Sequence, residues 1–248
     1  MMLEKLKKRI HGKALDNSAA PVLLVAFGDS VTQGCMRNYI DHENIYHNQL
    51  KRLLESAYPK TTFSVINAGV GGESAAGGIV RLERDVIRHA PDLVLIGFCL
   101  NDACAGKDAI PLFRQRIETI LHEVRNRTEA DIIILTPNFM ASHDNPNIEE
   151  VWREKAMDTI IACQNDGTLA AYVAELRGIA RRNDIALADI YAEWEAMEKR
   201  GEDTTARLCN GLNHPDAAGH TIIAETIIGL IRADGTYVRG EATKVNIH

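Results

Sequence analysis

Five short runs of Val, Ile and Leu constrain the fold of this chain more than any other feature. They lack the strict alternation of a half-exposed strand, which is typical of parallel strands covered on both faces. The runs are Val22–Phe27, Thr62–Ile66, Leu93–Gly97, Ile132–Thr136 and Ile185–Asp189. Stretches with helical periodicity follow them, at Gln49–Ala57, Ala75–His89, Leu112–Arg127, Leu169–Arg182 and Ala217–Ile231. This alternation predicts a three-layer α/β/α domain with about five parallel strands.

The length of 248 residues suits one such domain. We expect an N-terminal extension over residues 1–20, the domain over 21–235 and an exposed C-terminal tail over 236–248. Leu3, Leu6 and Ile10 would line one face of a short helix that packs on the body, the alternative being a dimer or membrane contact. The least regular stretch, Asn138–Asn165, is long enough to predict a pocket wall.

The composition of the chain limits the classes of molecule that we expect it to bind. The net charge of −6 with scattered basic residues argues against nucleic acid, and no apolar run reaches the roughly 18 residues of a stable membrane insertion. The cysteines are odd in number and form no CxxC, which favours free thiols; without an apolar signal segment, we expect a cytoplasmic protein. The sequence leaves open whether the protein forms a homo-oligomer. No spacing predicts a metal or a cofactor, and the phosphate-loop and dinucleotide patterns are both absent.

Candidates for chemistry follow the strands, because ligands of such sheets bind at the carboxyl ends of the strands. After the first strand comes Gly28-Asp29-Ser30, where Ser30 could present its hydroxyl at the sheet edge or simply cap a helix. After the second comes the glycine-rich loop Asn67–Ser74, which could approach a ligand closely or form a plain turn.

Two further candidates lie later in the chain. Asn101 follows the third strand and could donate its amide to an oxyanion or satisfy its own turn. His214 precedes Pro215, which suits the first turn of the last helix, so the imidazole would sit on a short loop within reach of the site.

Together these segments resemble the conserved blocks of the SGNH (GDSL) hydrolase family. Ser30 matches the serine of GDS, Asn67, Gly69 and Gly72 match NxGxxG, Asn101 matches the asparagine of the third block, and His214 matches the histidine of the last block in its HPxxxGH setting. The likeness spans about residues 22–231 and implies a flavodoxin-like SGNH hydrolase fold.

The resemblance also implies roles. Ser30 would be the nucleophile and His214 the general base of an esterase. The oxyanion hole would comprise the main-chain N–H groups of Ser30 and Gly72 and the side chain of Asn101. Asp29 would hold the turn rather than act as a base.

One position departs from the family pattern, which places an aspartate three residues before the histidine. Here Gly211 stands there, next to Asn210. Three partners for the His214 ring remain open: the carbonyl of Asn210, a main-chain carbonyl that leaves a Ser–His dyad, or a carboxylate from elsewhere such as Asp203 or Asp189.

The leading functional prediction is a serine esterase acting on a small-molecule ester, such as an acetyl group on a carbohydrate, through an acyl-enzyme intermediate. A lysophospholipase or thioesterase of the same family is an alternative. Two alternatives belong to other functional classes. The missing aspartate motivates a non-catalytic family member that binds a carbohydrate, and the architecture is shared by flavin-binding proteins.

Overall fold

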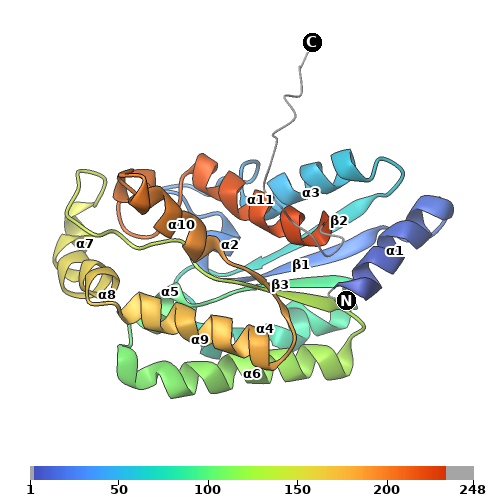
Figure 1. Cartoon of the computed structure of the whole chain (residues 1–248), viewed down its shortest axis with the longest axis horizontal. Helices are drawn as coiled ribbons and strands as arrows, with labels where there is room; N and C mark the ends of the chain where they lie inside the picture. The colour runs from blue at the N-terminus through green and yellow to red at the C-terminus, as the bar shows by residue number, and fades with distance from the viewer. Residues whose placement is uncertain (1–2, 233–248) are drawn as a thin grey trace, which may run out of the picture.

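The protein is an α/β/α sandwich built on one five-stranded parallel sheet (Figure 1). The computed structural model describes residues 3–232. The strands are β1 (Val22–Gly28), β2 (Phe63–Gly69), β3 (Leu93–Gly97), β4 (Asp131–Leu135) and β5 (Ala186–Ala188). They are ordered β2-β1-β3-β4-β5, so the strand order reverses between β1 and β3. The predicted three-layer architecture is confirmed.

The α-helices are α1 (Glu4–Leu15), α2 (Ser30–Gln33), α3 (Tyr46–Ala57), α4 (Ala75–Asp85), α5 (Leu100–Ala103), α6 (Ile110–Arg127), α7 (Glu150–Lys155), α8 (Ala162–Asn165), α9 (Thr168–Arg182), α10 (Ile190–Lys199) and α11 (Ala217–Arg232). Short 3₁₀ turns are η1 (Ile87–His89), η2 (Lys107–Ala109) and η4 (Thr205–Arg207), and η3 (Ala156–Ile161) is a π-helix. Helices α4, α6 and α9 cover one face of the sheet, and α3, α10 and α11 cover the other (Figure 1).

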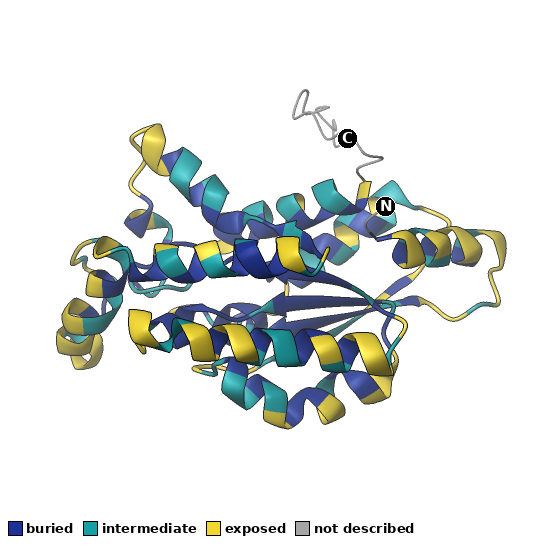
Figure 2. Ribbon diagram, turned by 60° about the horizontal axis from the view of Figure 1, so that its bottom comes forward, coloured by how far each residue is buried: buried dark blue, intermediate teal, exposed yellow. Residues whose placement is uncertain are grey.

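The core lies between these layers, where the strands are dark blue in Figure 2 and the outer helix faces are yellow. Residues Leu24–Phe27 of β1 and Leu93–Leu95 of β3 are almost fully buried. Their branched side chains face helices on both sides, which is why the apolar runs show no alternation.

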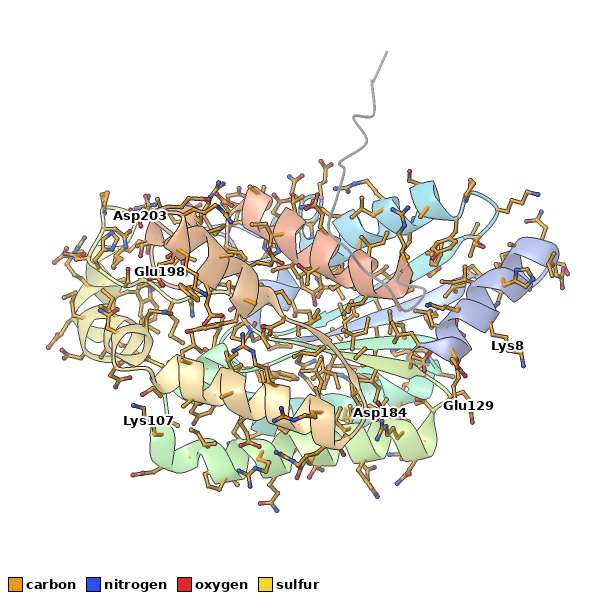
Figure 3. The ribbon with its side chains drawn as sticks, viewed as in Figure 1. Lys8, Lys107, Glu129, Asp184, Glu198 and Asp203 are labelled. Carbon is orange, nitrogen blue, oxygen red and sulfur yellow. The ribbon has the colours of Figure 1, made fainter. Side chains whose placement is uncertain are left out.

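Helix α1 closes the amino-terminal ends of the strands. Its apolar face is buried, and the main-chain N–H of Leu6 donates to Asp131 at the start of β4 (2.8 Å). Lys8 and Glu129 mark this end in Figure 3, whereas Asp203 lies at the opposite end. The carboxyl ends of the strands are therefore separated from α1 by the length of the sheet.

Two expectations about element bounds were wrong. Strand β2 runs on to Gly69, because Asn67, Ala68 and Gly69 pair with Ala26, Phe27 and Gly28 of β1 instead of opening a loop. The helix predicted over Ala75–His89 stops at Asp85 and continues as η1. No elements were predicted within Asn138–Asn165, and the structure places α7, η3 and α8 there. The predicted tail over 236–248 lies outside the described residues.

Candidate active site

Ser30 opens α2 directly after β1, beside the point where strand order reverses. Asp29 caps this helix, its carboxylate accepting the N–H of Val31 (3.0 Å). Ser30 is 6% exposed. The short helix thus presents the Ser30 hydroxyl, and the Asp29 cap leaves the main-chain N–H of Ser30 itself available at the first position.

His214 meets Ser30 from the other end of the sequence. Its Nε2 lies 2.9 Å from the Ser30 Oγ, and its Nδ1 lies 3.0 Å from the main-chain oxygen of Met36. A carbonyl oxygen can only accept, so in the neutral ring Nδ1 carries the proton and Nε2 offers its lone pair to the serine hydroxyl. The arrangement therefore presets the tautomer that a general base needs.

Burial lowers the pKa of His214 below its ordinary value, and the hydrogen bond to Met36 acts in the opposite direction. The imidazole is therefore neutral at pH 7 and ready to accept a proton. This is the state in which it can activate Ser30.

Asn210 does not hold the ring, contrary to the first of the three alternatives. Its side-chain oxygen accepts the main-chain N–H groups of Leu212, Asn213 and His214 at 3.0, 3.0 and 2.9 Å. With that oxygen occupied by the turn, Asn210 shapes the loop that carries His214, while the Met36 carbonyl contacts the imidazole.

Neither proposed carboxylate reaches the ring. Asp189 caps α10 and pairs with Arg177 (2.8 Å). Asp203 lies in the exposed turn after α10 (Figure 3), 3.6 Å from Nε2 of His143. The geometry is that of a Ser–His dyad with a main-chain carbonyl as the third group.

Gly211, which stands where the family has aspartate, cannot carry a larger side chain in this structure. Its φ is +70°, and a Cβ built there would lie 2.4 Å from Oδ1 of Asn145 and 2.7 Å from the main-chain nitrogen of Ile148. The irregular segment 138–148 fills the space beside the histidine loop. Asn145 also donates to the Gly211 carbonyl (2.9 Å), and Asn138 donates to that of Asn213 (2.9 Å).

The predicted oxyanion donors lie around the nucleophile turn. Within residues 3–232, the main-chain N–H groups of Ser30 and Gly72 have no protein acceptor. The side-chain amide of Asn101 donates one hydrogen to the main-chain carbonyl of Glu73 (3.0 Å), which leaves its second amide hydrogen available. Gly72 has φ +73°, a conformation that favours glycine and turns the loop after β2.

Asn67 and Gly69 fix the end of β2 against α2. The Asn67 amide donates to the carbonyl of Gln33 (3.1 Å), and its oxygen accepts the N–H of Gly69 (3.0 Å). A Cβ on Gly69 would lie 2.1 Å from the main-chain nitrogen of Gln33. These residues of the second block therefore have a packing role, bringing two backbones into contact.

Two buried carboxyl groups support the turn from inside. Burial raises the pKa of Asp29 to about 7 and that of Asp102 to about 6, the hydrogen bonds to the N–H groups of Val31 and Ala75 acting against it. Asp29 contacts the turn and not His214. It is a structural cap, in line with the sequence-based interpretation.

A small cavity of about 30 Å³ lies on the inner side of the nucleophile turn. It is lined by both neighbours of Ser30, Asp29 and Val31, and by Asn138, whose buried side-chain oxygen has no protein partner. The cavity is large enough for a water molecule. No group of three or more His, Cys, Asp or Glu side chains in the described part of the chain could hold a metal ion.

The fold and this serine–histidine geometry define a hydrolase of the SGNH type. Residues 26–222 match the model of the GDSL-like lipase/acylhydrolase family. The chain belongs to that family and is a carboxylic ester hydrolase.

Two relatives align with most of this chain, and solved structures share its fold. The chain is 30% identical to an uncharacterised lipoprotein, YqeF, of Bacillus subtilis over 82% of its own length and 87% of the relative's. It is 24% identical to an acetylxylan esterase of Geobacillus stearothermophilus, over 83% of this chain and 91% of that one. Its fold resembles a W190I mutant of Axe2, an acetyl-xylooligosaccharide esterase of the same organism, with a TM-score of 0.67 at 20% identity over 89% and 99% of the two chains. A lipase/acylhydrolase of Enterococcus faecalis gives a TM-score of 0.64 at 23% identity over 84% and 94%.

Sequence reasoning missed two features of the site. Met36 was not singled out, because a main-chain carbonyl carries no residue-specific signal. Arg81 was also missed. It lies beside the loop 70–74 between β2 and α4, here called the oxyanion loop because it carries the proposed donor Gly72; the paired glycines Gly77 and Gly78 on its helix were the available signal.

Proposed function

We propose that this protein is a serine esterase that removes a small acyl group, with an acetyl ester of a carbohydrate as its favoured substrate. The observation that carries the proposal is the 2.9 Å contact between Ser30 Oγ and His214 Nε2, with the Nδ1 proton directed at Met36. An activated serine beside free main-chain donors suits acyl transfer better than any binding role.

The mechanism follows from these contacts. Ser30 Oγ attacks the ester carbonyl carbon while its proton passes to His214 Nε2, and the carbonyl electron pair moves onto oxygen. The N–H groups of Ser30 and Gly72 and the Asn101 amide stabilise that oxyanion. Collapse expels the alcohol, which takes the proton from His214, and leaves an acyl-serine. Water then attacks by the same route, releasing the acid and restoring Ser30.

The Met36 carbonyl would make this dyad less effective than one with an aspartate. A neutral carbonyl orients the ring, but it stabilises the imidazolium less than a carboxylate does because the hydrogen bond lacks a full negative charge. Efficient turnover then depends more heavily on the oxyanion donors.

One observation supports a small acyl group: a relative of similar length is an acetylxylan esterase.

A cytoplasmic location is also part of the proposal. Cys35, Cys99, Cys104, Cys163 and Cys209 are all free thiols, which suits a reducing compartment. Within the described residues, no helix is both long and apolar enough to cross a membrane. Fractionation of cells, with detection of the natural protein in soluble and membrane fractions, tests the location.

The first experiment is hydrolysis of p-nitrophenyl acetate, butyrate and octanoate by the wild type and Ser30→Ala. We expect turnover that declines with chain length and falls by about 10⁴-fold or more in the variant. Acetate release from acetylated xylooligosaccharides then tests the carbohydrate. Octanoate preferred over acetate would favour a lipid esterase, and undiminished turnover by Ser30→Ala would contradict the mechanism.

A further inference from the structure

Arg81 is a buried cation under the proposed active site. It extends from α4, its side chain is 7% exposed, and its guanidinium donates to the main-chain oxygens of Gly28 (2.9 Å) and Ala68 (2.6 Å). Those two carbonyls lie at the carboxyl ends of β1 and β2, just before the nucleophile turn and the oxyanion loop. One side chain thus ties together the two strands from which the site is built.

Two aromatic rings and two glycines of α4 surround the Arg81 side chain. Its guanidinium carbon lies 4.6 Å from the centroid of the Phe27 ring and 5.9 Å from that of Phe98. A Cβ on Gly78 would lie 2.6 Å from the Phe98 ring, and one on Gly77 would lie 2.5 Å from Cγ of Glu73. Two glycines in one helix weaken it, but here they let α4 approach the aromatic rings and leave space for Glu73.

Glu73 connects Arg81 to the oxyanion donors. It follows Gly72 directly, and its carboxylate pairs with Nε of Arg81. Its main-chain carbonyl accepts the amide of Asn101 (3.0 Å). The same residue therefore adjoins the donor Gly72, holds the donor Asn101 and is itself anchored to a buried guanidinium.

We infer that the Arg81–Glu73 ion pair is a positioning device, which holds the Gly72 N–H and the Asn101 amide where the oxyanion forms. The inference rests on the proposed function. Neither Arg81 nor Glu73 contacts the reacting atoms; they act through the loop. Preorganised donors strengthen binding in the transition state more than in the ground state, so a displaced loop lowers kcat with little effect on KM.

Asp85 provides a matched control. It is a second carboxylate on Arg81, with Oδ2 3.0 Å from Nη1, but it lies on α4 and its hydrogen bonds go to Arg81 and Arg84. Removing Glu73 or Asp85 takes one carboxylate from the same guanidinium. Only the loss of Glu73 releases the loop.

The experiment compares Glu73→Ala, Glu73→Gln and Asp85→Ala with the wild type on p-nitrophenyl acetate, with folding checked by circular dichroism. We expect kcat to fall about 10- to 100-fold in Glu73→Ala with KM within about twofold, because loss of a whole donor costs about 10²- to 10³-fold. Glu73→Gln, which can still accept from Arg81, should recover most of that loss. Asp85→Ala should keep kcat within about twofold.

Equal kcat values for Glu73→Ala and Asp85→Ala would overturn the inference. If Glu73→Ala does not fold, Glu73→Asp decides, because its shorter side chain can reach Arg81 only by shifting the loop: a lower kcat at unchanged KM supports positioning, and wild-type kinetics contradict it. Ser30→Ala in the same assay separates the two proposals. Activity that survives in Ser30→Ala refutes the esterase mechanism, whereas an inactive Ser30→Ala beside a fully active Glu73→Ala refutes the positioning role alone.

Discussion

The two halves of the proposed dyad are held in different ways. Ser30 begins helix α2 directly after a buried strand, where Asn67 and Gly69 hold the end of β2 against α2. His214 lies on an irregular loop whose main chain is held by amide side chains, Asn210 from within and Asn138 and Asn145 from the neighbouring segment. The nucleophile side is thus set by backbone packing and the histidine side by side-chain hydrogen bonds. The first should tolerate substitution less well than the second.

The largest expected contrast is between His214→Ala and Asn210→Ala. Removing the base should lower kcat by about 10⁴-fold or more. Asn210→Ala loses three hydrogen bonds to one turn, but the Met36 carbonyl still orients the ring, so we expect a loss of about 10-fold. Steady-state kinetics on purified, folded variants measure both. Equal losses would mean that Asn210 is needed for the chemistry itself.

The next contrast lies within the nucleophile side, between Gly69→Ala and Gly72→Ala. At Gly69 a Cβ meets main-chain atoms that cannot move aside, so we expect destabilisation of about 3 kcal/mol. At Gly72 the space is open and only the positive φ of +73° is strained, at a cost of about 1 kcal/mol. Chemical denaturation gives both free energies of unfolding. A more stable Gly69→Ala than Gly72→Ala would show that the two backbones do not meet as described.

Restoring the aspartate of the family, with Gly211→Asp, should reduce activity rather than improve it. The new side chain would collide with Asn145 and Ile148, and we expect the free energy of unfolding to fall by about 2 kcal/mol. Gly201→Asp is the control, because Gly201 has a similar φ of +79° in open space. A gain in kcat for Gly211→Asp would indicate that segment 138–148 moves aside and that a carboxylate at position 211 can reach the His214 imidazole.

The smallest effect concerns pH. The general base must be neutral, so activity is lost when His214 becomes protonated at low pH. Because burial lowers the pKa of His214, the midpoint of the acidic limb of kcat/KM should lie below the ordinary imidazole value of 6.5. If Asp29, with its pKa raised to about 7, were the base, the limb would lie near neutrality and Asp29→Asn would abolish it. A pH–rate profile of the wild type and Asp29→Asn distinguishes these. A limb near pH 7 in the wild type that disappears in Asp29→Asn would move the base to Asp29.

Much of the fold and part of the site were predictable because they depend on residue type. Buried parallel strands require uninterrupted apolar runs, and the carboxyl ends of such strands converge at one edge, so Ser30 and Asn101 could be placed near each other. His214 could be added because Pro215 predicts that the last helix begins nearby; in the structure Pro215 forms a β-bridge with Leu208, and α11 begins at Ala217. The extension of β2 to Gly69 was missed, because Asn and Gly are typical of turns and here pair within the sheet.

The sequence by itself determined the three-layer architecture, the family, and the serine and histidine that meet in the site. Tertiary structure alone decided what orients His214, since every residue carries the same main-chain carbonyl and only the path of the chain brings that of Met36 to Nδ1. The tertiary structure also leaves no room for an aspartate side chain at position 211, because the segment 138–148 occupies the space beside Gly211. The same holds for Arg81, a charged residue that becomes a buried link because the carbonyls of two strand ends and the carboxylate of Glu73 surround it.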